Sequence, residues 1–209
     1  MEELLDAIRK GDLALVGRLL DSDPSLLDGP GLLQAIYHGR ADVAQLFLAR
    51  GHRPTLHEAA ALGDSARVRE LLDADPSQLD SFGDDGFNAI GLAIFFRHAA
   101  LAKMLIERGA DVAAPARNPM KVAPVHAAAT QGDRETMQLL LDRGADPNAR
   151  QQMDYTPLHG SAGRGDIETA RLLIAHGADP RAKASDGKTP ADLARERGFD
   201  ELAQLLDAE

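Results

Sequence analysis

Apolar and polar residues recur along the chain with one fixed offset. A large apolar residue lies 14 positions after each of seven anchor positions. The anchors are Leu5, Leu33, His57, Gly91, His126, His159 and Asp192, and the apolar residues are Leu19, Phe47, Leu71, Leu105, Leu140, Leu173 and Leu206. Successive anchors are 28, 24, 34, 35, 33 and 33 residues apart. Such self-similarity predicts a protein built of repeated units.

Each unit predicts two short helices. The first has small residues on its packed face, as at Ala128 and Ala129, and in six of the seven units it ends at a glycine six residues after the anchor. Arg97 takes the glycine's place in the fourth unit. In four units an aspartate follows, placed to cap the second helix: Asp12, Asp64, Asp133 and Asp166. The second helix carries an apolar stripe, such as Met137 and Leu140, at helical spacing.

The runs at residues 155–159 (YTPLH) and 139–149 (LLLDRGADPNA) resemble the ankyrin repeat, a unit of about 33 residues with a turn and two helices. The resemblance covers residues 2–207. It implies an all-α solenoid of stacked helix–turn–helix units in one domain, residues 1–209, capped by its first and last units. The expected units are 1–28, 29–52, 53–81, 82–114, 115–149, 150–182 and 183–209.

The same resemblance assigns structural roles to two sets of residues. The anchor histidines His57, His126 and His159 should hydrogen-bond within the turn and brace adjacent units. Leu71, Leu105, Leu140 and Leu173 should fill the interfaces between helices. Short β-hairpins or finger-like loops are expected only in the C-terminal two-thirds of the chain, around residues 80–89, 113–123, 148–156 and 181–189. The second finger is two residues longer than the standard one, and the third lacks the usual Asp-Gly turn.

Composition excludes several classes of protein. The chain has 209 residues, no cysteine and a net charge of −10, which excludes thiolate metal sites and disfavours a sequence-independent grip on nucleic acid. Acidic residues at the N-terminus and the lack of a long apolar run argue against a secretory signal or membrane span, so we expect a cytoplasmic protein. The excess of arginine over lysine favours a bacterial source.

No catalytic or metal-binding motif emerges from the sequence. The seven histidines lack metal-ligand spacing, and no phosphate-binding loop or nucleophile motif occurs. Residues 21–28 and 73–80 are near copies with paired aspartates, but they lack the glycine and closing glutamate of a calcium loop. These segments predict helix terminators with capping aspartates. We expect no catalytic residue, no metal and no cofactor.

The few aromatic residues indicate a binding surface, because six of the eight fall where stacking makes no demand on them. Aromatic, methionine and arginine side chains are enriched in protein interfaces. The predicted partner-binding residues are Tyr37, Phe87, Leu92, Phe95, Phe96, Met120, Met153, Tyr155 and Arg164. We interpret the chain as a non-catalytic, monomeric scaffold that binds an unknown protein partner through its concave groove and fingers. Its acidic surface favours a partly basic partner.

Three alternatives stay open at this point. The loop 114–122 could fold over Phe95 and Phe96 and make them local core. The chain could be a self-associating structural protein. A pocket beneath the same loop, near Arg97, His98 and Asn118, could bind a small molecule or support catalysis. The exposure of the two phenylalanines distinguishes the first alternative from the binding surface.

Overall fold

The computed structural model describes all residues, 1–209, and its secondary structure is helical, with no β-strand. Fourteen α-helices form seven consecutive pairs. They are α1 (Glu2–Lys10) and α2 (Leu13–Ser22), α3 (Gly31–Tyr37) and α4 (Ala41–Ala49), α5 (Leu56–Leu62) and α6 (Ser65–Ala74), α7 (Ala89–Phe95) and α8 (Ala99–Glu107), α9 (Pro124–Gln131) and α10 (Arg134–Asp142), α11 (Pro157–Arg164) and α12 (Ile167–Ala175), and α13 (Pro190–Glu196) and α14 (Asp200–Ala208). The only β pairing is an isolated antiparallel bridge between Phe82 and Asn88. None of the helices has the length and apolarity needed to cross a bilayer.

The chain divides into two compact units, Met1–Leu71 and Leu72–Glu209. In unit 1, α3 packs against α1, α4 and α5, and α1 packs against α2. Leu4, Ile8, Leu32 and Phe47 form the centre of its core and are almost completely buried. The first two helix pairs are joined without fingers, as the short anchor spacings predict.

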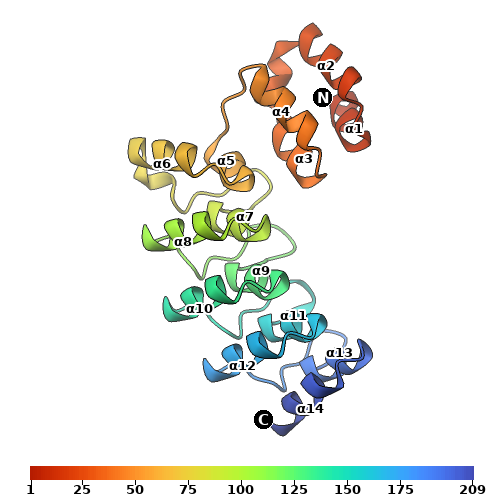
Figure 1. Ribbon diagram of the computed structural model, residues 1–209, viewed down its shortest axis with the longest axis vertical. Coiled ribbons are helices and arrows are strands. Elements are labelled where there is room, and N and C mark those ends of the chain that lie inside the picture. Colours follow the sequence, from red (N-terminus) through yellow and green to blue (C-terminus); the bar gives the residue numbers. More distant parts are fainter. The chain divides into compact units, whose positions relative to one another are not determined.

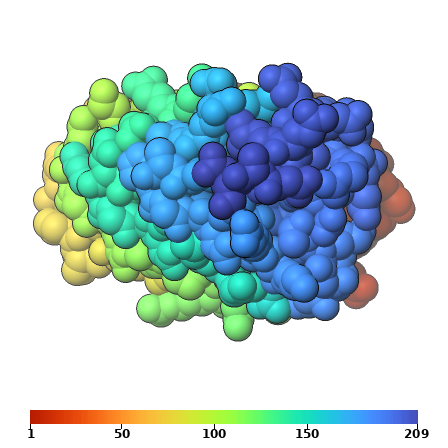
Figure 2. Space-filling view, turned by 90° about the horizontal axis from the view of Figure 1, so that it is seen from below, coloured from red at the N-terminus to blue at the C-terminus, as the bar shows by residue number.

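Unit 2 stacks its helices in two layers (Figure 1). The first helices of successive pairs pack side by side, α7 against α9, α9 against α11 and α11 against α13; we call these the inner helices. The second helices α8, α10 and α12 pack in the same order and form the outer layer. The pair α13–α14 lies at the C-terminal end of the stack, where it forms the front of the view in Figure 2.

The predicted core positions are buried in the second helix of every pair except α2 and α6. Leu105, Leu140 and Leu173 are each 0% exposed. Leu71, at the same offset in α6, is only half-buried, and the next residue, Leu72, is 2% exposed instead. The apolar stripe of α6 is therefore displaced by one residue from the predicted one.

Aspartate caps fix where the second helix begins in four of the seven pairs. The carboxylates of Asp12, Asp64, Asp133 and Asp166 each accept a hydrogen bond from the backbone N–H three residues ahead. This confirms the predicted N-caps. The repeated acidic segments are also caps, because Asp23 and Asp75 accept hydrogen bonds from Ser25 and Ser77 at the start of two short 3₁₀ helices, Pro24–Asp28 and Pro76–Gln78.

Left-handed residues end the inner helices. Gly132 and Gly165, directly after α9 and α11, have φ values of 68° and 72°. At the equivalent place after α7, Arg97 has a φ of 65°. A left-handed conformation brings the Cβ atom too close to the following carbonyl oxygen, which is unfavourable for any L-residue but not for glycine.

We therefore expect Arg97→Gly to stabilise the protein by about 1 kcal/mol, since the relieved strain exceeds the added backbone entropy of the unfolded chain. Equilibrium urea unfolding measures the difference. Arg97→Ala, which keeps the Cβ atom, serves as the control and should not be stabilising. A glycine variant no more stable than the alanine variant would contradict the strain.

Candidate functional site

Four finger loops precede the inner helices of unit 2. Each is closed by one backbone hydrogen bond in which the first residue's N–H donates to the last residue's carbonyl. The pairs are Gly83–Phe87 (2.8 Å), Ala116–Val122 (2.9 Å), Gln151–Tyr155 (3.0 Å) and Ala184–Lys188 (2.9 Å). The second finger spans two residues more than the other three, as its sequence predicts. The fingers are tight turns rather than paired strands.

Neighbouring fingers are joined to one another. The backbone N–H groups of Arg117, Gln152 and Ser185 donate to the carbonyls of Gly86 (2.7 Å), Met120 (2.8 Å) and Met153 (2.9 Å) in the preceding finger. Gly86 is needed for this approach, because a Cβ atom there would lie 2.8 Å from the Arg117 carbonyl. The four fingers thus form one continuous row.

The third finger makes a strained turn. Met153 and Asp154 both have positive φ, 64° and 57°, the conformation of a type I′ turn that normally contains Asn-Gly or Gly-Gly. The turn also holds the Met153 side chain in solvent, 52% exposed. Strain of this kind persists where the surrounding structure enforces it, often at functional sites.

Two anchor histidines brace adjacent units, as the resemblance implies. His126 Nδ1 accepts from the Ala123 N–H (3.2 Å), and its Nε2 bonds the Ala149 carbonyl (2.9 Å), two residues before the next finger. His159 makes the same pair of bonds with Thr156 (3.2 Å) and Lys188 (3.2 Å). Burial lowers the pKa of both imidazoles below its usual value, and their hydrogen bonds to carbonyls oppose this only partly.

The third anchor, His57, does not occupy the capping position that His126 and His159 occupy. Helix α5 begins one residue later in the repeat than α9 and α11, so the third position after its N-cap is Glu58. The Glu58 carboxylate accepts from the Thr55 N–H (2.9 Å) and lies 2.9 Å from His52 Nε2. Glu58 takes the capping position because α5 begins one residue later, while His57 keeps its distance from the glycine that ends the helix.

The two buried histidines predict a loss of stability in mild acid. An unfolded chain protonates its histidines near pH 6.5, before the folded state does, so protons favour unfolding as the pH falls below that value. Above pH 6.5 both states are neutral at these positions and the effect vanishes. Urea midpoints measured from about pH 7.5 to about pH 5 should decrease. The His126→Gln/His159→Gln double variant should show a smaller decrease; an equal decrease would contradict the assignment.

The predicted partner-binding residues differ in exposure. Phe95 (44%), Met120 (44%) and Met153 (52%) are exposed, and they are the only large apolar side chains of unit 2 that are. Tyr37, Phe87, Phe96 and Tyr155 are half-buried. Leu92 is 1% exposed, so its predicted place on the surface is wrong: it lies on the packed face of α7. Because Phe95 is exposed, the loop 114–122 does not make it local core.

The exposed residues form two groups rather than one patch. Met120 and Met153 lie on fingers, which lead into the N-termini of the inner helices. Phe95 lies at the C-terminus of α7, where it forms an edge-on ring contact with Phe96 at 5.0 Å. Its carbonyl accepts from the side chain of Gln131, the last residue of α9. The eight residues of α9 separate the two groups by about 12 Å along the helix axis.

Arg164, predicted to bind a partner, also makes a structural contact within the protein. Its guanidinium donates to the Thr130 carbonyl (3.0 Å) at the end of the preceding inner helix. Gln131 and Arg197, at the same position of their units, donate to the carbonyls of Phe95 (3.1 Å) and Gly163 (3.4 Å). In these three repeats of unit 2, a side chain thus caps the inner helix of the preceding repeat. Comparison of the residue before each terminal glycine could have revealed this series.

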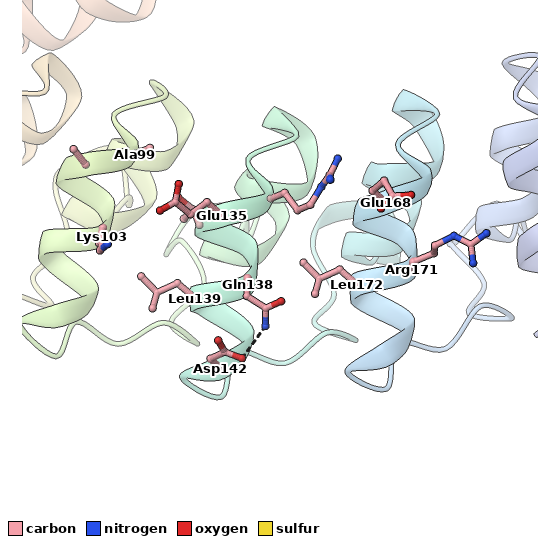
Figure 3. A pocket seen from close by; sticks show the side chains of 12 residues that line it. Ala99, Lys103, Glu135, Gln138, Leu139, Asp142, Glu168, Arg171 and Leu172 are labelled. Carbon is pink, nitrogen blue, oxygen red and sulfur yellow. Dashed lines mark hydrogen bonds between the residues drawn. The ribbon is translucent and has the colours of Figure 1, made fainter.

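Two hollows of unit 2 are not lined by Phe95, Met120 or Met153. One, of about 950 Å³, is an open groove over α8, α10 and α12, where Leu139 and Leu172 lie between charged side chains such as Lys103, Glu135 and Arg171 (Figure 3). A second hollow, about 900 Å³, lies beside the second finger and includes Asn118 but neither Arg97 nor His98. The polar groups suggested for a pocket beneath that loop therefore do not converge there.

Comparisons with known proteins agree with this architecture. The chain is 37% identical over 90 residues to a homologue of transient receptor potential cation channel subfamily A member 1 from Caenorhabditis elegans, covering 43% of this chain and 7% of that protein. It is 30% identical over 100 residues to ankyrin repeat and SAM domain-containing protein 6 of Mus musculus (45% and 10%). It is 28% identical over 165 residues to an ankyrin repeat protein of fowlpox virus (71% and 37%).

The chain thus spans less than two-fifths of each of these relatives. The family model for ankyrin repeats (3 copies) matches residues 32–116, 56–151 and 125–208, which together cover most of the chain. The matched ranges include the finger row, the bracing histidines and the two helix layers described above. The chain belongs to the ankyrin repeat family.

Proposed function

We propose that this chain is a non-catalytic scaffold that binds a partner protein through the fingers and inner helices of unit 2. Ankyrin repeats are generally protein–protein interaction modules without enzymatic activity. The observation that carries the proposal is the exposure of Phe95, Met120 and Met153, which stacking of the helices does not require. Exposed apolar side chains of this kind are enriched at the centres of interfaces.

The arrangement of these residues supports a preformed surface. Met120 and Met153 stand on fingers whose backbones are hydrogen-bonded to one another, and Phe95 is held against Phe96. Methionine adapts its shape to a partner, whereas a supported aromatic ring gives a rigid contact at low entropic cost. A partner that spans both groups would touch the ends of several inner helices at once.

The test is affinity capture from a lysate of the organism that encodes the chain, with Phe95→Ser and Met120→Ser/Met153→Ser variants beside the wild type. We expect at least one protein to be retained by the wild type and reduced about tenfold or more by the variants, since loss of an interface centre costs about 2 kcal/mol or more. Circular dichroism should show that all variants are folded.

Leu13→Ser is the matched control, because Leu13 is 40% exposed but lies in α2 of unit 1. It should retain the same protein as the wild type. Equal retention by the wild type and the unit 2 variants would contradict the proposed surface.

A further inference from the structure

A row of arginines follows one edge of unit 2. The edge is formed by the C-terminal ends of the inner helices, and the capping bonds from Gln131 to Phe95, Arg164 to Thr130 and Arg197 to Gly163 link its successive members. Arg97 lies just beyond the end of α7, two residues after Phe95. Arg97, Arg164 and Arg197 are all exposed. The row therefore places three cations on one side of the stack.

These cations keep donors for a ligand. A guanidinium carries five N–H donors in a rigid fork that matches a carboxylate. Arg164 and Arg197 each donate one hydrogen bond to a carbonyl, and none of the three arginines forms an ion pair. None of the three is neutralised by a side chain of the protein.

The neighbouring carboxylates are engaged elsewhere. Asp133 and Asp166 directly follow the glycines that end α9 and α11, and each caps the next outer helix through its backbone N–H groups. Glu196, in the last turn of α13, pairs with Lys188 at 2.9 Å. The edge thus presents three arginines that these carboxylates do not pair with, although the whole chain has a net charge of −10. The expectation of a partly basic partner, drawn from the overall charge, does not describe this edge.

We infer that this edge binds an acidic segment of the partner protein, whose carboxylates contact the arginines and whose apolar side chain packs on Phe95. The inference rests on the proposed function and specifies the chemistry of its partner. Adjacent helices lie about 8–10 Å apart. An extended chain rises about 3.3 Å per residue. Carboxylates about three residues apart would therefore match Arg164 and Arg197, with about twice that interval to Arg97.

The experiment is selection of displayed random peptides of about twelve residues, a length of about 40 Å that can span the three arginines. Immobilised full-length protein is the bait. We expect the enriched peptides to contain more aspartate and glutamate than the input library. The protein's net negative charge repels acidic peptides, so such an enrichment would indicate a specific site. The most enriched peptide is then synthesised, and its affinity is measured by fluorescence anisotropy.

Two charge-matched variants locate the site. Arg97→Gln should weaken that peptide about tenfold, the effect of one charge-assisted hydrogen bond. Arg171→Gln, which removes an exposed arginine from the outer helix α12, should change its affinity less than twofold. Both variants alter the net charge equally, so a general electrostatic effect would weaken both alike.

The outcomes separate this inference from the proposed function. Acidic enrichment with selective loss in Arg97→Gln supports it. Enriched peptides without an acidic excess, or equal weakening by both variants, overturn the inference and leave the scaffold function standing. Failure of Phe95→Ser to alter capture from the lysate contradicts the proposed surface and the inference together.

Discussion

Replacing Leu140 with alanine is expected to destabilise the protein by about 2–5 kcal/mol, the range for deleting a fully buried leucine side chain. Leu140 is 0% exposed in α10, which packs against α8, α9 and α12. The substitution therefore leaves a cavity where the two helix layers and three repeats meet, and the rigid neighbours can fill it only partly. Equilibrium urea unfolding followed by circular dichroism measures the loss.

Leu206→Ala is the matched comparison. Leu206 occupies the same repeat position and is 2% exposed, but its helix α14 lies at the end of the stack and packs chiefly against α13. A terminal helix can relax into a cavity more freely than a central one, so this variant should lose less stability. Equal losses at the two positions would contradict the stacking described for unit 2.

Replacing His126 with alanine should have an effect of similar size, about 2–5 kcal/mol, because it leaves two buried backbone groups without partners. His126 is 2% exposed and joins the Ala123 N–H to the Ala149 carbonyl. Each buried group left unsatisfied costs about 1–3 kcal/mol. The variant is measured by urea unfolding at a pH near 7.5, where the imidazole is neutral.

Two further variants control this prediction. His57→Ala should cost less, because His57 is half-buried and the capping bonds of Thr55 are made by Glu58. Glu58→Ala should cost more than His57→Ala, because Glu58 is 6% exposed and satisfies the Thr55 N–H. A larger loss of unfolding free energy in His57→Ala than in Glu58→Ala would contradict this assignment.

The repeat architecture could be predicted from the sequence because its signals are local. The spacing of apolar residues, the terminal glycines and the capping aspartates each fix a helix start or end within a few residues. Asp133 shows this well, since its position alone predicts the cap that the structure contains. His57 shows the limit. Helix α5 has one residue fewer before its terminal glycine than α9 and α11, and the distance of His57 from that glycine does not reveal where the helix begins.

The candidate surface was predicted only in part. Phe95, Met120 and Met153 are exposed as expected, because repeat position predicts which side of a helix or finger a residue occupies. Leu92 is buried. Successive residues of a helix are rotated by about 100° about its axis, so a residue next to a groove position can lie on the packed face instead. The charge of the arginine edge could not be predicted from the net charge, which sums over all faces of the molecule.

The bonds between neighbouring units have a consequence for the thermodynamics of recognition. Neighbouring repeats of unit 2 are tied at one end of their inner helices by finger bonds, to which His126 and His159 add bonds in two cases. At the other end they are tied by arginine or glutamine caps. Two separated attachments oppose both sliding and rotation of one unit on the next. Unit 2 therefore offers a ligand a surface with little conformational entropy left to lose, so that the ordering penalty of association falls mainly on the partner.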